Sequence, residues 1–395
     1  MPNKYFKLGG AKRLHEIVMV GTHDAGINQP GHGNVQTQTL DIAGQASAGV
    51  RFFDLRIAAA KSAPGPQGKR VEMKAYHGDL KTKTKLREVE IGAGTWQLQQ
   101  VERSTMKWEG WGLSLTSILT DARNFVLNNT TEFLLLKFDK CNNWGLIAEA
   151  AVAVLGNTLY NAGGDLNTKQ LADLQGKVIV LFSDEGLQEI TPAAIVARAA
   201  ANFARGAAAL APNLDSILPW QNLEKEPNPP YLTNPRRQGL KYFGGFGDSM
   251  MQSTTNKKIK KNLDKQVSNM TAARLQDYRV LRMMYWTTTG IGQNIQDRNR
   301  EMWQPPCLKN FLTAWDAGVS NSVRAHTPLL PTQGFADVTA TGAMAAATQI
   351  HDYFPNIIMI DFADQSKCDL IYNLNLLTTT QVARGMSVIG MRAGA

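Results

Sequence analysis

Short runs of apolar, often β-branched residues recur along the chain and are separated by longer, mixed segments. Runs of this kind predict strands, and because most are almost continuously apolar, we expect the strands to be covered on both faces. Six runs are clear: Ile17–Thr22, Val50–Ile57, Glu132–Phe138, Lys177–Phe182, Val280–Thr287 and Asn356–Phe362. Two weaker candidates, Lys74–His77 and Leu240–Phe246, bring the expected number of strands to eight.

Apolar residues at helical spacing fill several of the gaps between these runs. The segments are Leu115–Leu127, Asn143–Tyr160, Pro192–Ala208, Asn256–Tyr278 and Thr339–Tyr353. Strands alternating with helices over this length predict an α/β fold, a closed parallel (β/α)8 TIM barrel. Because helical patterns are sparse around residues 50–80, we expect the barrel to be irregular. A doubly wound open sheet is the alternative architecture.

The length of the chain and its loop segments favour a single domain. The chain has 395 residues, 43% of them hydrophobic, which suffices for one large domain or two ordinary ones. The stretch Asn213–Arg237 is rich in Pro and Asn, as is typical of a long surface loop rather than a domain linker. We therefore expect one catalytic domain over residues 1–395, with surface loops at about 62–70, 213–237 and 326–334.

Charge and composition narrow the classes of partner. The net charge of +9 favours anionic partners such as lipid headgroups, whereas no recognisable nucleic-acid-binding pattern is present. No apolar run is long enough to cross a bilayer, and the N-terminus has no signal-peptide pattern. The three cysteines are far apart and fit neither a disulfide framework nor a zinc site.

Charged side chains recur where the expected strands end. The set is His23 and Asp24, Asp54 and Arg56, His77, Lys137 and Asp139, and Asp361. In a (β/α) barrel the carboxyl ends of the strands form the active site, so these side chains should meet at one rim. Asp54 and Arg56 are two residues apart on one strand and therefore point to the same face.

This set of residue types suggests phosphate-ester cleavage without a metal ion. Two imidazoles, His23 and His77, can act as general base and general acid because each titrates near neutral pH. The guanidinium of Arg56 can stabilise charge that builds on a phosphoryl oxygen. Each residue also has a structural explanation. Asp54 and Arg56 could form an ion pair that stabilises the barrel, and the side chain of Lys137 could extend from the strand end towards solvent. Their common position at one rim favours the functional interpretation.

Six stretches resemble the X-domain type of phosphatidylinositol-specific phospholipase C, and its bacterial members most of all. The specific ones are Gly21–Gly26 (GTHDAG), Gly49–Arg56 (GVRFFDLR) and Tyr76–Gly78 (YHG). Weaker matches follow in family order at Thr131–Lys137, Gly176–Leu181 and Ile358–Phe362. The resemblance spans about residues 17–365 and implies an irregular TIM barrel.

The resemblance implies a role for each rim residue. His23 would be the general base that deprotonates the inositol hydroxyl next to the phosphodiester, and Asp361 would orient its imidazole. His77, assisted by Asp24, would be the general acid that protonates the diacylglycerol oxygen. Arg56 would clamp the phosphoryl oxygens, and Asp54 would position Arg56.

Two comparisons with the family pattern bear on metal and headgroup. Calcium-dependent relatives hold their ion with acidic residues near the position of Arg56, so the fixed positive charge here predicts metal independence and no cofactor. Ser183 stands where bacterial relatives carry an inositol-binding Arg. Asp248 matches an inositol-binding Asp, but Met250 replaces the aromatic residue that packs on the ring. Lys137, Asp248 and Ser183 are therefore the expected substrate-binding positions.

The resulting hypothesis is a metal-independent phospholipase C that cleaves phosphatidylinositol, or its glycan-linked forms, to diacylglycerol and a cyclic inositol phosphate. We expect a monomer that acts peripherally at a membrane surface. Family resemblance favours a secreted or extracellular protein, while the missing signal pattern keeps a cytoplasmic location open. The alternatives are a related barrel phosphodiesterase with another headgroup and a catalytically silent barrel that binds anionic lipid or a protein.

Overall fold

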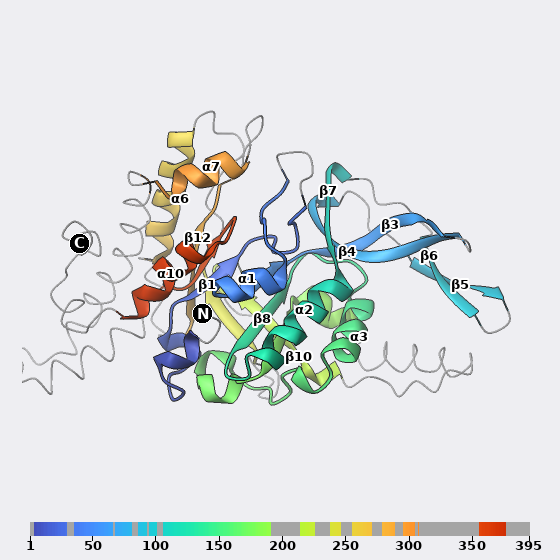
Figure 1. Cartoon of the computed structure of the whole chain (residues 1–395), viewed down its shortest axis with the longest axis horizontal. Coiled ribbons are helices and arrows are strands. Elements are labelled where there is room, and N and C mark those ends of the chain that lie inside the picture. Colours follow the sequence, from blue (N-terminus) through green and yellow to red (C-terminus); the bar gives the residue numbers. More distant parts are fainter. Residues whose placement is uncertain are drawn as a thin grey trace, which may run out of the picture.

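A closed barrel of eight strands forms the centre of the structure (Figure 1). The computed structural model describes residues 4–29, 35–65, 68–80, 86–92, 95–100, 106–190, 214–225, 238–245, 255–270, 279–288, 295–304, 307 and 355–376. The barrel strands are β1 (Met19–Thr22), β2 (Val50–Leu55), β8 (Phe133–Phe138), β9 (Lys177–Phe182), β10 (Ile217–Asn222), β11 (Leu240–Phe243), β12 (Leu281–Trp286) and β13 (Pro355–Ile360). Their order around the barrel is β1-β13-β12-β11-β10-β9-β8-β2, and every neighbouring pair is parallel. The expected TIM-barrel architecture is confirmed, and the open sheet is excluded because the strands close on themselves.

Helices cover the outside of the barrel. Within the described residues they are α1 (Ile42–Ala48), α2 (Leu115–Asn128), α3 (Trp144–Leu155), α4 (Asp184–Glu189), α6 (Thr255–Met270), α7 (Ile295–Met302) and α10 (Gln365–Asn373). Short 3-10 helices occupy Tyr5–Leu8, Leu14–Glu16, Gly156–Thr158, Leu166–Thr168, Leu171–Leu174, Leu214–Ser216 and Leu374–Leu376. Polar side chains cap the first turns of several of these helices. At the start of α2, for example, the hydroxyl of Ser114 accepts a hydrogen bond from the N–H of Ser117. None of the described helices is long and apolar enough to cross a bilayer.

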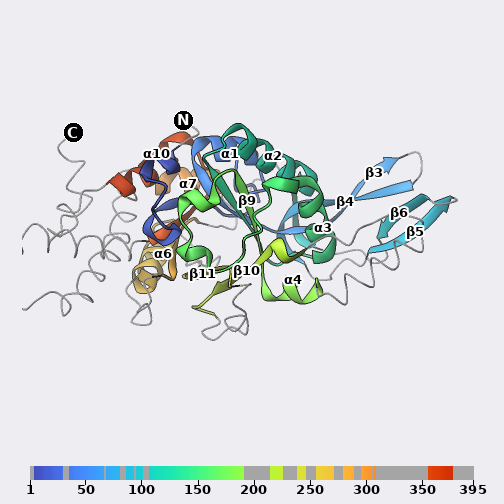
Figure 2. The ribbon, with the colours of Figure 1, turned by 90° about the horizontal axis from the view of Figure 1, so that it is seen from below.

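An antiparallel arm leaves the barrel directly after β2. A three-stranded sheet contains β3 (Ile57–Gly65), β4 (Gly68–Leu80) and β7 (Met106–Ser114), and a two-stranded sheet contains β5 (Leu86–Gly92) and β6 (Thr95–Gln100). Figures 1 and 2 both show β3 to β6 projecting to one side of the barrel. Because β3 begins where β2 ends, the arm starts at the carboxyl-terminal rim of the barrel.

Two apolar layers stabilise the barrel, one in its lumen and one under the helices. Alternate residues of each strand contribute to the two layers, as Leu135 and Leu136 of β8 illustrate. Space in the lumen is tight at Gly21 of β1, where a Cβ atom would lie 2.4 Å from the sulfur of Met359. A larger residue at this point of the first strand would therefore require the side chain of Met359 to move.

The structure confirms the six clear strands within a few residues and corrects three expectations. The segment Lys74–His77 is not a barrel strand, because it belongs to β4 and pairs with β3 and β7. The eighth barrel strand is β10, which lies inside the stretch 213–237 that was expected to be a loop. The sequence pattern did not predict β10 because it contains Pro219, and proline normally argues against a strand inside a sheet.

The loop expected at about 62–70 is also corrected, since β3 continues to Gly65 and β4 begins at Gly68. The closely spaced Pro and Gly residues mark the tight end of a hairpin rather than a long loop. Helices α2 and α3 confirm two expected helices, and α6 covers the first part of Asn256–Tyr278. The helices expected at Pro192–Ala208 and Thr339–Tyr353, and the loop at 326–334, lie outside the described residues.

Candidate active site

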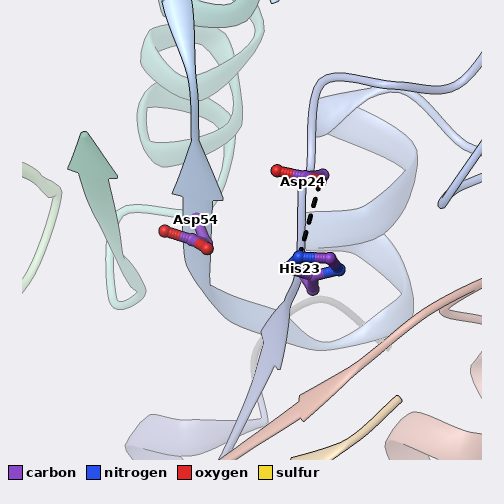
Figure 3. A group of neighbouring side chains, drawn as sticks. All are labelled: His23, Asp24 and Asp54. Atoms are coloured by element: carbon purple, nitrogen blue, oxygen red, sulfur yellow. Dashed lines mark ion pairs between the residues drawn. The ribbon is translucent and has the colours of Figure 1, made fainter. Parts of the chain in front are cut away.

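The expected catalytic residues come together at the carboxyl ends of adjacent barrel strands. His23 follows β1 and Asp361 follows β13, the strand that pairs with one edge of β1. β2 pairs with the other edge of β1 and brings Asp54 to the same rim. Figure 3 shows the side chains of His23, Asp24 and Asp54 on these neighbouring strand ends.

His23 lies between two carboxylates. Its Nδ1 is 3.3 Å from Oδ1 of Asp361, and its Nε2 is 3.4 Å from Oδ2 of Asp24. Burial favours the neutral imidazole, but the nearby carboxylates of Asp24 and Asp361 outweigh burial and raise the pKa of His23 to about 9. Burial also raises the pKa of Asp361, although the hydrogen bond with His23 opposes this shift. The pair therefore holds a proton tightly at neutral pH.

Asp24 is the centre of the site, because a single carboxylate contacts three basic side chains. Its Oδ2 lies 2.6 Å from Nδ1 of His77, and its Oδ1 lies 3.0 Å from Nε of Arg56. Burial alone would raise the pKa of Asp24, but Arg56, His23 and His77 hold it far below its usual range. The backbone of Asp24 is left-handed, with a φ of 44°. Strained residues of this kind persist where the surrounding structure fixes them, which is common at functional sites.

The arm, and not a barrel strand, brings His77 to the site. His77 lies in β4, and the N–H of the preceding Tyr76 donates a 3.0 Å hydrogen bond to the carbonyl oxygen of Arg56. The pairing of β4 with β7 shifts register directly after His77, and Gly78 there has a φ of 137°. Such irregularities re-aim side chains next to active sites. The position of His77 therefore depends on the root of the arm.

Arg56 and Asp54 each form an ion pair with a different residue, and a role of Asp54 in positioning Arg56 stays a prediction. Arg56 pairs with Asp24, whereas the carboxylate of Asp54 lies 2.7 Å from the ammonium of Lys137. The physical reason is register: Asp54 of β2 stands opposite Lys137 of β8, so their lumen-facing side chains meet. Arg56 lies one residue beyond β2 and reaches the next carboxylate at the rim. Its side chain remains 18% exposed, so the guanidinium is accessible to a ligand.

Lys137 is the most enclosed of the expected substrate-binding residues. Its ammonium contacts Asp54 and also lies 3.3 Å from Asp139 and 4.2 Å from the centre of the Trp220 ring. Burial works to lower the pKa of Lys137, but Asp139 and Asp54 outweigh it and hold the pKa well above its ordinary value. Lys137 is therefore a permanent cation in the lumen, and its contact with a sugar hydroxyl remains a prediction.

Of the other two expected substrate-binding residues, only Ser183 lies in the described part of the structure. Ser183 caps α4, where its hydroxyl accepts a hydrogen bond from the N–H of Gly186. Asp248 lies outside the described residues, as does Met250.

Three aromatic residues of the lumen were not expected at the site. Tyr285 of β12 lies edge-on to His23, with ring centres 6.3 Å apart. Trp220 of β10 stacks on Tyr242 of β11, with ring centres 5.9 Å apart. The period of two along the expected strands could have placed Tyr242 and Tyr285 in the lumen, whereas Trp220 was hidden in the strand mistaken for a loop.

His23, Asp24 and Asp54 also form the geometric beginning of a metal site. One ligand atom from each lies within 4.8 Å of the others. However, Lys137 already neutralises Asp54 and Arg56 already neutralises Asp24. A divalent cation would have to compete with both side chains. Metal independence of the reaction stays a prediction.

Comparison with known proteins places this geometry in context. No protein-family model matches the chain, and no curated protein does either. The structure is similar to those of bacterial phosphatidylinositol-specific phospholipases C. The enzyme from Listeria monocytogenes is 14% identical at a TM-score of 0.44, with 94% of this chain and 97% of that chain covered. A mutant of the Staphylococcus aureus enzyme is 11% identical at a TM-score of 0.47, with 94% and 96% covered. The function of the chain therefore has to be inferred from its own side chains.

Proposed function

We propose that the chain is a phospholipase C that cleaves phosphatidylinositol or its glycan-linked forms without a metal ion. The observation that carries the proposal is the shared carboxylate of Asp24, which contacts two imidazoles and a guanidinium at the rim of a barrel. The sequence motifs around His23, Arg56 and His77 resemble that family and support the same assignment. A binding module has no need of an acid–base pair in this arrangement.

The reaction divides into two proton transfers around one phosphorus atom. His23 takes the proton of the inositol hydroxyl beside the phosphodiester, and the hydroxyl oxygen then forms a new bond to phosphorus. The bond from phosphorus to the diacylglycerol oxygen breaks, and His77 donates a proton to that leaving oxygen. The products are a cyclic inositol phosphate and diacylglycerol, so atoms and charge balance without water or an added cofactor.

The remaining rim residues support these transfers electrostatically. Arg56 and both imidazoles contact the same carboxylate, that of Asp24. The guanidinium can stabilise the negative charge on the non-bridging phosphoryl oxygens. Asp361 holds Nδ1 of His23, so the same imidazole orientation is kept through the reaction. The pKa of about 9 means that His23 must first lose a proton to act as base, which makes the reaction faster at alkaline pH.

The substrate would be presented at a lipid surface. The arm starts at the catalytic rim, and the segment 61–71, where β3 and β4 meet, contains Lys61, Lys69 and Arg70 but no acidic residue. Basic segments of this kind attract anionic lipid headgroups. The proposal is a monomeric, peripheral enzyme of the secreted type, with a cytoplasmic enzyme as the alternative location.

A second candidate function is a metal-dependent barrel phosphodiesterase with another headgroup, such as a glycerophosphodiester. The observation that favours it is the cluster of His23, Asp24 and Asp54 with ligand atoms within 4.8 Å. In that case Arg56 and Lys137 would have to release their carboxylates when the ion binds.

Phosphorus NMR of the purified protein with phosphatidylinositol in detergent micelles and excess EDTA tests the proposal. We expect the resonance of a cyclic inositol phosphate to appear. Cleavage only after Ca²⁺ or Mg²⁺ is added, or cleavage of glycerophosphodiesters alone, would favour the second candidate. Liposome binding without any phosphorus-containing product would contradict both and favour a silent barrel.

A further inference from the structure

The backbone ladder between β1 and β13 ends at His23 and does not reach Asp24 or Asp361. The last backbone hydrogen bond runs from the N–H of His23 to the carbonyl oxygen of Ile360, at 3.2 Å. Beyond it the chain turns left-handed on both sides, at Asp24 with a φ of 44° and at Phe362 with a φ of 50°. Regular pairing therefore fixes the backbone N–H of His23 but not the segments that carry Asp24 and Asp361.

A buried glutamine takes over where the ladder ends. The amide nitrogen of Gln38 donates hydrogen bonds to the carbonyl oxygens of His23, at 3.1 Å, and Ile360, at 3.3 Å. Its amide oxygen accepts a 3.1 Å hydrogen bond from the N–H of Ala363. Gln38 is fully buried, so water does not compete for these bonds. One side chain thus ties the residue that carries the base to both sides of Asp361.

The neighbouring threonine does the same for Asp24. The hydroxyl of Thr37 donates a 2.8 Å hydrogen bond to the carbonyl oxygen of Asp24. The carbonyl oxygen of Thr37 accepts a 2.7 Å hydrogen bond from the N–H of Phe362. Both left-handed residues are therefore held by one segment, which is itself anchored by hydrogen bonds from the N–H groups of Thr37 and Gln38 to the carbonyl oxygen of Ile27.

We propose that Thr37 and Gln38 are positioning residues that hold His23, Asp24 and Asp361 in register for proton transfer. The inference rests on the proposed function for its catalytic readout, but its structural readout does not. A general base must lie within hydrogen-bond reach of the proton it removes, and a displacement of about 1 Å can cost on the order of 100-fold in rate. Neither residue touches the substrate in this account.

The isosteric change Gln38→Met tests the clamp, because it removes all three hydrogen bonds and keeps the volume. We expect kcat to fall about 10- to 100-fold while KM changes less than about 2-fold. The matched control is Asn356→Leu at the opposite end of the barrel. The Asn356 side chain also makes three backbone hydrogen bonds, to the carbonyl oxygens of His15 and Ile17 and from the N–H of Arg282. We expect this control to lose stability but to keep kcat within about 2-fold.

A second pair of variants keeps the test decisive if Gln38→Met does not fold. Thr37→Val removes the hydroxyl at nearly constant volume, and Thr37→Ser retains it. We expect Thr37→Val to lower kcat about 10-fold and Thr37→Ser to restore it to within about 2-fold of the wild type. Equal kcat values for both variants would contradict the role of Thr37.

Proton NMR separates the clamp from the proposed function. The Nδ1–H proton of His23, identified by its absence in His23→Gln, should resonate downfield because of the contact with Asp361. We expect Gln38→Met, but not Asn356→Leu, to move this resonance upfield. An inactive wild type with this response would overturn the function and keep the clamp. An unchanged resonance and kcat in folded Gln38→Met, or an equal loss of kcat in the Asn356 control, would overturn the clamp.

Discussion

The two ends of the barrel treat buried charge in opposite ways. At the amino-terminal end, Arg51 and Glu132 form a fully buried pair, with nitrogen to oxygen distances of 2.8 and 2.7 Å. The remaining oxygen of Glu132 accepts hydrogen bonds from the backbone N–H groups of Tyr5 and Phe6, and Arg51 also donates to backbone carbonyl oxygens. One positive charge meets one negative charge, and neither side chain is accessible to solvent.

At the carboxyl-terminal end, one carboxylate contacts three basic side chains. Asp24 faces His23, His77 and Arg56, and the last two side chains are 20% and 18% exposed. The local backbone at Asp24 is left-handed as well. A closed pair stabilises the fold, whereas an open cluster keeps charge and protons available for a ligand. The exposure of the side chains and the ratio of acidic to basic groups, rather than the presence of charge, therefore distinguish the structural cluster from the catalytic one.

The largest expected effect breaks the rim and spares the fold. We expect His23→Ala and His77→Ala each to lower kcat by about 10²- to 10⁴-fold, because each removes one partner of general acid–base catalysis. The free energy of unfolding at pH 7 should change far less for His77→Ala than for His23→Ala, because the side chain of His77 is partly exposed and that of His23 is buried. Initial-rate assays and urea unfolding measure the two quantities. Full activity in both variants would contradict the assignment.

The reciprocal change at the other end should break the fold and spare the chemistry. We expect Glu132→Ala to lower the free energy of unfolding by about 3–5 kcal/mol, because it leaves Arg51 buried without its counter-charge. The kcat of the fraction that remains folded should stay within about 2-fold of the wild type. Urea unfolding followed by circular dichroism, with rates corrected for folded protein, provides the measurement. A large loss of kcat at unchanged stability would show that the two ends are coupled.

The raised pKa of His23 predicts a pH-dependent stability. The folded state binds this proton more tightly than the unfolded state, whose pKa lies near 6.5, against about 9 in the fold. The contribution is therefore fully present below pH 6.5 and is lost as the pH rises through 9. We expect a decrease on the order of 3 kcal/mol over this range, since the pKa of His23 rises from 6.5 to about 9 and one pKa unit corresponds to about 1.4 kcal/mol. In His23→Gln the decrease should be smaller, and an identical slope in both proteins would contradict the shift.

A smaller effect concerns the pH profile of the reaction. Because neutral His23 is the base, the limb of kcat/KM that rises with pH should have its midpoint near pH 9. Asp24 is the largest influence that raises the pKa of His23, so Asp24→Asn should move this limb to lower pH by one unit or more. Its maximal rate should also fall, since Arg56 and His77 lose their common partner. A limb at the same pH in both proteins would exclude His23 as the titrating base.

The smallest expected effect is that of metal ions. Because Arg56 and Lys137 already pair with Asp24 and Asp54, excess EDTA followed by Ca²⁺ or Mg²⁺ should change kcat by less than about 2-fold. Steady-state rates in metal-depleted buffer provide the check. A large activation by either ion would transfer the weight to the metal-dependent candidate.

Much of the fold could be predicted because buried parallel strands have a simple signature. Runs such as Glu132–Phe138 are apolar apart from Glu132 and Lys137, and their order along the chain matches the order of the barrel. β10 escaped because Pro219 and the surrounding Asn and Pro residues resemble a loop, and only the neighbouring strands reveal its place. His77 was predicted on a barrel strand, whereas an antiparallel arm brings it to the rim.

Partners within the site were less predictable than its members. The sequence placed His23, Asp24, Arg56 and Asp361 at one rim, and the structure brings them together. The sequence alone does not show that Asp54 pairs with Lys137, because this ion pair depends on the register between β2 and β8. The clamp by Gln38 lies in a segment without any periodic pattern, so only its three-dimensional contacts identify it.

The most direct test of the account uses a substrate whose leaving group needs no acid. In inositol phosphate esterified to nitrophenol, the leaving oxygen is stable as an anion, so His77 becomes dispensable while His23 is still required as the base. We predict that His77→Ala recovers most of its lost kcat with this substrate compared with phosphatidylinositol, whereas His23→Ala remains inactive with both. Equal defects of the two variants on the two substrates would contradict the division of roles on which the account depends.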